Sequence, residues 1–129
     1  MIDIKLNNDD TILIQKFFLK LKGLMKELKN IEYEILEDME IIFDDTKFTI
    51  IFPKVDKEIM YDKDIIMNIR LPKEEITIYK EKCITYQVDK ACSIKIKFEY
   101  LYNIFVYISS NDILHMYMND SSYLHCDLN

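Results

Sequence analysis

Lysines are the side chains whose type and spacing most clearly suggest a chemical role in this sequence. Residues 11–29 contain five lysines and one glutamate, which give the segment a net charge of +4. The whole chain carries −6, so the remaining residues carry −10. The five are Lys16, Lys20, Lys22, Lys26 and Lys29. Ammonium groups gathered on one segment can neutralise the phosphates of a nucleic acid without reading its sequence.

The same segment has the periodicity of an amphipathic helix. At about 100° per residue, its apolar side chains fall on one side: Leu13, Ile14, Phe17, Phe18, Leu21, Leu24, Met25 and Leu28. The five lysines fall on the opposite side, together with Gln15, Gly23 and Glu27. We therefore predict a helix over residues 11–29 that Asp10 or Thr11 opens and Asn30 ends.

Three interpretations of the lysine face stay open. It is the ordinary solvated face of a surface helix, a contact surface for a DNA backbone, or a face that docks on a membrane or an acidic partner. The last is disfavoured because the domain needs the apolar side of this helix for its own core. The chain has one arginine, Arg70, and no basic stretch interleaved with aromatic residues, which argues against recognition of particular bases.

Residues that commonly act in catalysis or bind metals form no recognisable set. Cys83, Cys92 and Cys126 include no C-x-x-C pair, and His115 and His125 stand ten residues apart in alternating segments. Isolated strand residues are a simpler interpretation than a metal site formed by the histidines and Cys126. Serine-nucleophile and zinc-protease motifs are also missing from the sequence.

Paired carboxylates offer a further route to metal-dependent chemistry. Glu37-Asp38 and Asp44-Asp45 are pairs of the kind that hold Mg²⁺. They fall at predicted strand ends and turns, where aspartate is favoured for local hydrogen bonding. We therefore expect a protein that is not an enzyme and that needs no metal or cofactor.

Composition limits the classes of protein that this chain can represent. With 129 residues, 50% of them hydrophobic and 31% charged, it suits one soluble domain with one core. A single glycine excludes glycine-rich phosphate loops. The longest apolar run, Ile104–Ile108, is too short to cross a membrane, and no secretory signal opens the chain. We expect an intracellular protein in a reducing compartment, encoded by an AT-rich genome such as that of a large DNA virus or a parasite.

Alternating apolar residues predict strands along the rest of the chain. The predicted strands cover residues 2–6, 31–35, 39–43, 48–52, 65–71, 76–78, 83–88, 93–97, 113–118 and 123–128. Asp44-Asp45-Thr46 reads as a tight turn, and a second helix is predicted over Phe98–Ile108. Residues 54–73 are the least regular part, a charged stretch followed by the strand that ends at Pro72, and they read as an insertion or an extended hairpin.

This order of elements repeats. A strand, a helix and paired strands occur in residues 1–53 and again in residues 93–129, which indicates an internal duplication. We predict one domain over residues 1–129, with a first half at 1–53, the insertion at 54–73 and a second half at 74–129. The expected fold class is α+β, an antiparallel sheet with two helices side by side on one face.

Several segments together resemble one domain of the DNA sliding clamps, the proliferating cell nuclear antigen family. The most specific are ITYQVDK (84–90), CSIKIKFEYLYNIF (92–105), SNDILHMYMND (110–120) and SSYLHCDL (121–128). IDIKL (2–6) and the basic helix 11–29 match the family in order and character. The resemblance covers most of the chain outside residues 54–73.

The resemblance implies a DNA-clamp-like fold and a non-catalytic role in DNA replication or repair, as a processivity or scaffold factor. It implies helices that face duplex DNA, self-association into a ring or edge to edge, and replication or repair proteins as partners. The location would be a nucleus or a viral replication site. The residues expected at the DNA backbone are the five helix lysines with Lys95 and Lys97, which stand just before the second helix. The alternative is an interaction module or regulator of the same fold that does not bind DNA.

Overall fold

The computed structural model describes residues 1–27, 38–53, 55–62, 65–71, 74–109, 111–119 and 123–128. For residues 24–27, 55–62 and 65–71 it describes the backbone only. Its elements in chain order are β1 (Ile2–Lys5), α1 (Asn8–Glu27), β2 (Met39–Phe43), β3 (Lys47–Ile51), β4 (Val55–Asp62), β5 (Ile65–Leu71), β6 (Glu75–Tyr79), the 3₁₀ turn η2 (Lys80–Lys82), β7 (Thr85–Val88), β8 (Cys92–Ile96), α2 (Phe98–Phe105), β9 (Leu114–Met118) and β10 (His125–Leu128). The α+β class is confirmed.

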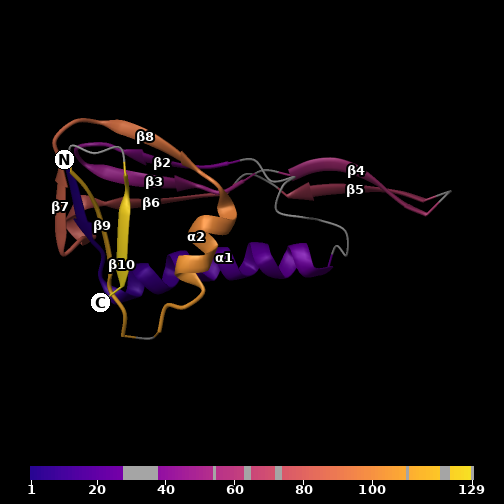
Figure 1. Ribbon diagram of the computed structural model, residues 1–129, viewed down its shortest axis with the longest axis horizontal. Coiled ribbons are helices and arrows are strands. Elements are labelled where there is room, and N and C mark those ends of the chain that lie inside the picture. Colours follow the sequence, from indigo (N-terminus) through magenta and orange to yellow (C-terminus); the bar gives the residue numbers. More distant parts are fainter. Residues whose placement is uncertain are drawn as a thin grey trace.

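The described strands form two four-stranded antiparallel sheets, besides the two-stranded sheet of β4 and β5, where the sequence led us to expect one sheet. Sheet A has the order β10-β9-β1-β7 and sheet B the order β6-β3-β2-β8. Buried residues of both sheets and both helices belong to one apolar core, so the helices pack against the inner faces of the sheets. Figure 1 shows α1 running below sheet B, with α2 crossing beside it.

Each helix carries the chain from one sheet to the other. β1 precedes α1 and lies in sheet A, whereas β2 follows α1 and lies in sheet B. The second half does the reverse, because β8 lies in sheet B and β9 in sheet A. The strand before each helix therefore pairs with the strand after the other helix, as Ile4 with Met116 and Ile41 with Ile94 show. The expected repeat of strand, helix and paired strands is present, and its two copies are intertwined.

Phe18 on α1 is the residue that connects the layers of the core. Its ring lies 5.0 Å from the ring of Phe52, 5.5 Å from that of Phe98 and 4.7 Å from that of Phe105. These partners come from the end of β3 and from α2. Aromatic pairs at such separations add to the free energy gained by burying their apolar surface. One side chain thus fixes α1 against both the sheet and the second helix.

The first helix begins earlier than predicted. Asn7 caps it, since the Asn7 Oδ1 accepts a hydrogen bond of 2.7 Å from the backbone N–H of Asp10. An asparagine at this position satisfies an N–H group that the first turn leaves unpaired. The expected start at Asp10 or Thr11 is wrong for a second reason. Thr11 is buried, and its hydroxyl accepts a hydrogen bond from the N–H of Leu114.

Residues 54–73 contain a hairpin, which was one of the two predictions for this stretch. β4 and β5 pair antiparallel in a two-stranded sheet, which extends away from sheets A and B in Figure 1. The strand predicted over Ile65–Leu71 is confirmed, and the charged stretch before it proves to be a strand as well. The strand predicted over 31–35 and the helix end at Asn30 lie outside the described residues.

The second helix ends at Phe105, three residues before the predicted end. From Tyr107 on, its backbone hydrogen bonds reach back three residues, as from the Tyr107 N–H to the Ile104 carbonyl. The remaining predicted strands are found within one or two residues of their predicted ends. None of the helices in the parts of the chain that the structure covers is both long and apolar enough to cross a bilayer.

Candidate nucleic-acid interface

Lys16 and Lys20 project from the side of α1 that faces solvent. Both residues are exposed. The Lys20 Nζ lies 3.0 Å from the Glu74 Oε1, just before β6, and the two side chains are 61% and 36% exposed. An ion pair this open to water stabilises the fold weakly. Lys20 is therefore still available to a stronger anionic partner such as a phosphate.

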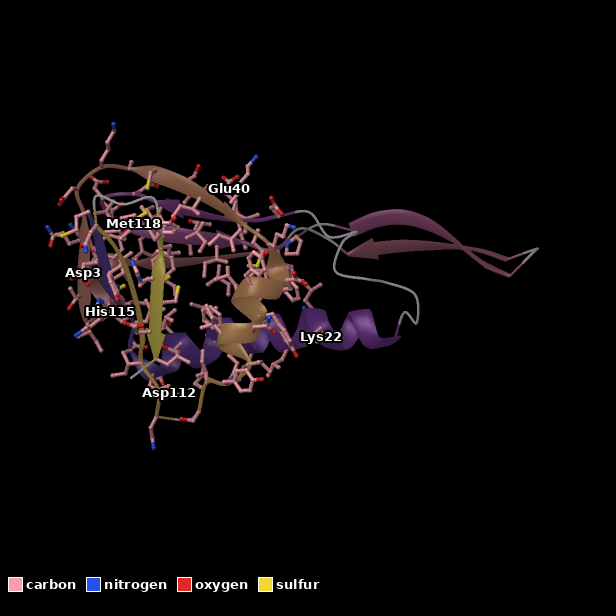
Figure 2. All side chains as sticks on the ribbon, viewed as in Figure 1. Asp3, Lys22, Glu40, Asp112, His115 and Met118 are labelled. Carbon is pink, nitrogen blue, oxygen red and sulfur yellow. The ribbon has the colours of Figure 1, made fainter. Side chains whose placement is uncertain are left out.

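Lys22 lies on a different side of the helix from the one predicted. It is half-buried, and its Nζ lies 5.6 Å from the centre of the Tyr102 ring on α2. Figure 2 shows Lys22 where the two helices meet. Gln15, also predicted on the solvent side, donates hydrogen bonds to two carbonyl groups at the end of α2. Both placements were wrong for one reason: α2 covers a flank of α1 that an isolated helix would leave in water.

The structure separates the two lysines before the second helix. Lys97 is exposed and precedes the first turn of α2. Lys95 lies on β8 opposite Glu40, and both alternate with residues packed in the core. Lys95 therefore lies on the outer face of sheet B, away from the helices. Of the remaining predicted residues, Lys26 belongs to α1 without a described side chain, and Lys29 lies outside the described residues.

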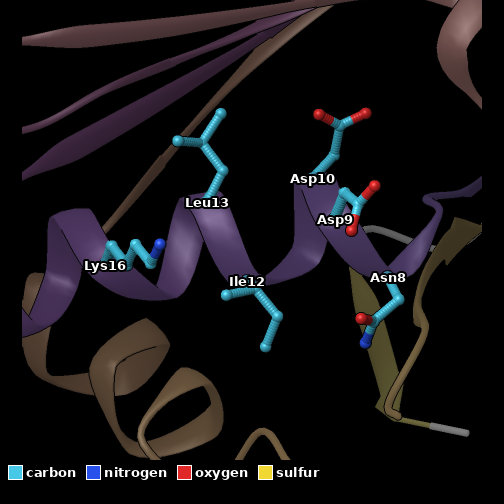
Figure 3. Close-up of a pocket in the computed structure, with 6 residues that line it drawn as sticks. All are labelled: Asn8, Asp9, Asp10, Ile12, Leu13 and Lys16. Atoms are coloured by element: carbon cyan, nitrogen blue, oxygen red, sulfur yellow. The ribbon is translucent and has the colours of Figure 1, made fainter. Parts of the chain in front are cut away.

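The start of α1 is acidic. Because the helix begins at Asn8, its first turn includes Asp9 and Asp10. Carboxylates there, followed by lysines, suit the helix dipole, which is positive at the N-terminus and negative at the C-terminus. An open pocket of about 520 Å³ lies at this end of the helix and is lined by Asn8, Asp9, Asp10, Ile12, Leu13 and Lys16. Figure 3 shows these side chains on the first turns of α1. Its two carboxylates repel phosphate, so an anion is favoured further along α1.

The outward side of α2 carries aromatic residues in place of lysines. Tyr100 is 59% exposed and Tyr107 is 79% exposed. Asn103 is also exposed between them in the sequence. We call Tyr100, Asn103 and Tyr107 the tyrosine stripe. None of the three was among the site residues predicted from the sequence. The available signal was the seven-residue spacing of the two tyrosines, which corresponds to two turns of the helix predicted over Phe98–Ile108.

The histidines lie together on the outer face of sheet A. The His115 Nε2 is 2.7 Å from the Asp3 Oδ1, and the Tyr117 ring lies 4.9 Å from that of His115 and 4.7 Å from that of His125. Figure 2 shows Asp3 and His115 close together at this sheet. Within the described residues, no three histidine, cysteine or acidic side chains are arranged to hold a metal ion.

Two of the cysteine thiols are poor nucleophiles. Burial, with a smaller effect of Asp127, raises the pKa of Cys126 from 9.0 to about 11. Burial also raises the pKa of Cys83 to about 11, with smaller effects of Asp10 and Glu81. The thiolate is the reactive form, so both groups are protonated and unreactive at neutral pH.

Asp44, which belongs to the carboxylate pair Asp44-Asp45, takes part in the β2–β3 turn, where its backbone N–H donates a hydrogen bond to the Lys47 carbonyl.

Comparison of the sequence with known protein families and with curated proteins finds no match.

Proposed function

We propose that this protein is a non-catalytic, DNA-clamp-like factor that contacts the backbone of duplex DNA without reading the base sequence. The contact is made through the layer formed by α1 and α2, which we call the helix layer. It acts in DNA replication or repair as a processivity or scaffold protein, in a nucleus or at a viral replication site. The observation that carries the proposal is the repeated order of strand, helix and paired strands, whose two copies are intertwined. It puts both helices on the inner sides of two sheets, and sliding clamps build each domain from the same repeated strand–helix–strands order.

The charges on the helix layer support contact with phosphate. Lys16, Lys20 and Lys97 are exposed, and the half-buried Lys22 lies on the flank of α1 that meets α2. Flexible ammonium groups release counterions from a DNA backbone, and this kind of binding weakens steeply as salt concentration rises. Lys95 lies on the outer face of sheet B, away from the helices, so we do not include it in the proposed DNA-binding surface.

Self-association is part of the same proposal. β7 and β10 are the edge strands of sheet A, and β6 and β8 those of sheet B. Edge strands present unpaired backbone groups that can pair with a second chain. Copies joined edge to edge in a closed ring would place their helices on a common side.

The test measures the solution mass by light scattering and DNA affinity by titration with a labelled duplex, at low and at moderate salt. We expect an oligomer near the mass of six chains, and duplex binding that weakens as salt is added. The double variant Lys16→Glu/Lys20→Glu should bind more weakly. It should also make the plot of log affinity against log salt concentration less steep, by about one unit of slope for each phosphate that the substituted lysines no longer neutralise.

A matched control separates local contact from net charge. Lys80→Glu/Lys90→Glu changes net charge by the same amount at exposed residues outside the helices, and it should retain most of the affinity. If both double variants lose affinity equally, the attraction is a general effect of charge. If the wild-type chain stays a monomer and ignores duplex DNA at low salt, the proposal is wrong.

A second function is favoured by one observation. The described lysines of the helix layer are partly engaged, Lys20 with Glu74 and Lys22 with Tyr102, while Asp9 and Asp10 make the start of α1 acidic. This pattern suits an interaction module or regulator of the same fold that binds another protein and no DNA. A stable complex with a replication or repair protein, without affinity for DNA, would establish it.

A further inference from the structure

Tertiary structure brings aromatic and basic side chains together that lie far apart in the sequence. The tyrosine stripe of α2 is separated from the lysines of α1 by about eighty residues. In the fold, the two helices are in direct contact through the hydrogen bonds of Gln15 to α2 and through Lys22 over the Tyr102 ring. The tyrosine stripe thus belongs to a segment that packs directly on the basic helix, an arrangement that the linear sequence hides.

The two tyrosines are not part of the buried core. The inner side of α2 is supplied by Phe98, Leu101 and Phe105, which are at most 4% exposed. Replacing Tyr100 or Tyr107 with a polar residue would therefore leave the core unchanged. Both rings are largely exposed to water, Tyr100 on α2 and Tyr107 two residues beyond its end.

The charges around the stripe favour an anion that also carries flat rings. Lys97 is exposed next to the first turn of α2, and Lys22 lies on the flank where α1 meets it. Glu99, half-buried in the first turn of α2, is the acidic residue nearest to Tyr100 in the sequence. A carboxylate there also suits the positive end of the helix dipole.

We propose that the tyrosine stripe and the adjacent lysines bind single-stranded DNA, with Tyr100 and Tyr107 stacking on unpaired bases. Proteins that hold single strands without sequence preference combine cationic groups along the backbone with aromatic rings under the bases. In a duplex the faces of the bases are covered by their neighbours, so Tyr100 and Tyr107 cannot stack on them. The inference rests on the proposed DNA contact and adds unpaired DNA to the duplex DNA whose backbone the lysines are proposed to contact.

The test compares three labelled ligands of equal length by fluorescence anisotropy: an oligothymidine strand, the same backbone with abasic residues, and a duplex. We expect the wild-type chain to bind oligothymidine at least about fivefold more tightly than the abasic strand, which corresponds to one stacked base. The variant Tyr100→Ala/Tyr107→Ala should lose this preference while binding the abasic strand as before.

Two further variants distinguish stacking from other roles. Tyr100→Phe/Tyr107→Phe keeps both rings and should keep the preference for oligothymidine. Tyr79→Ala/Tyr123→Ala removes two tyrosines, 51% and 71% exposed, that lie outside the helices, and should bind all three ligands like the wild type. Circular dichroism and thermal unfolding of each variant check that the fold is retained. Tyr107→Ala alone, beyond the last residue of α2, provides a second, milder variant.

The outcomes separate this inference from the proposed function. If wild type binds duplex but shows no preference for oligothymidine over the abasic strand, the stacking inference is wrong and the backbone contact stands. An alanine double variant that keeps the preference also overturns stacking. Binding of oligothymidine without binding of duplex would support the stripe and contradict the duplex proposal. A wild-type chain that binds none of the three ligands overturns both.

Discussion

The Nε2 atom of Gln15 on α1 donates a hydrogen bond of 3.1 Å to the backbone carbonyl of Phe105, the last residue of α2. The same amide group donates a second bond, 2.9 Å long, to the carbonyl of Ile108. The last carbonyl groups of a helix have no partner within it. An eight-residue helix such as α2 is also too short to be stable alone in water. One side chain of the long helix therefore completes the end of the short one.

Replacing Gln15 with alanine should lower the free energy of unfolding by about 1–3 kcal/mol, because two part-buried carbonyl groups lose a donor. Urea denaturation measures this difference. Gln87→Ala is the control, since the Gln87 amide bonds only to the exposed Asp89 among the contacts that the structure gives it, and it should change stability by less than about 0.5 kcal/mol. Equal effects of the two substitutions would contradict a special role for Gln15.

Phe18→Ala should be among the most destabilising single substitutions, at about 3–5 kcal/mol, because it leaves a cavity among three aromatic rings. Phe18→Leu fills part of that cavity and should cost less. Leu13→Ala on the same helix is the comparison, since Leu13 is 41% exposed and removing it creates no cavity. Thermal unfolding of the three variants should rank them in this order, and a Leu13 effect as large as that of Phe18 would mean that the core is packed differently.

Stability should fall in alkaline solution. Burial raises the pKa of Cys126 and of Cys83 from 9.0 in the unfolded chain to about 11 in the folded one. The folded state therefore holds these protons more tightly, and the stability that results is fully present below pH 9. It is lost as the pH rises toward 11, where the unfolded chain has already released them. Urea unfolding across this range should show the decline, and Cys83→Ala/Cys126→Ala should reduce it.

Part of that decline should remain in the double cysteine variant. Burial also raises the pKa of Tyr86, with smaller effects of Cys83, Asp44 and Asp45. Its hydroxyl donates a hydrogen bond of 2.5 Å to the Asp44 carbonyl, which joins β7 of sheet A to the β2–β3 turn of sheet B. Tyr86→Phe should cost about 1 kcal/mol at neutral pH because it removes this bond. A triple variant with no remaining alkaline decline would confirm that these three groups cause it.

The Lys20–Glu74 ion pair should contribute little to folding. A double-mutant cycle with Lys20→Ala and Glu74→Ala should give a coupling energy below about 1 kcal/mol, smaller still at high salt. A larger value would mean that Lys20 is held in place by the fold, and it would weaken the proposal that this side chain turns to a DNA phosphate.

Much of this fold could be predicted from the sequence because local patterns decide local structure. The alternation of apolar residues in Met39–Phe43 and in Ile65–Leu71 predicted those strands within a residue or two of their observed ends. The apolar periodicity of residues 11–29 predicted α1, since Ile14, Phe18 and Leu21 recur at helical spacing. The strand between Val55 and Asp62 was missed because its charged residues obscure the alternation.

Only the tertiary structure decided which strands pair and which helix faces meet water. The alternation of apolar residues is the same whether a strand joins sheet A or sheet B. It therefore could not predict that β2 lies in a different sheet from β1, or that β9 lies in a different sheet from β8. A helical wheel treats every side away from the core as solvent, yet α2 covers the flank of α1 that carries Gln15 and Lys22. For the same reason the sequence predicted a basic helix, while only long-range packing brought the helix that carries Tyr100 against it.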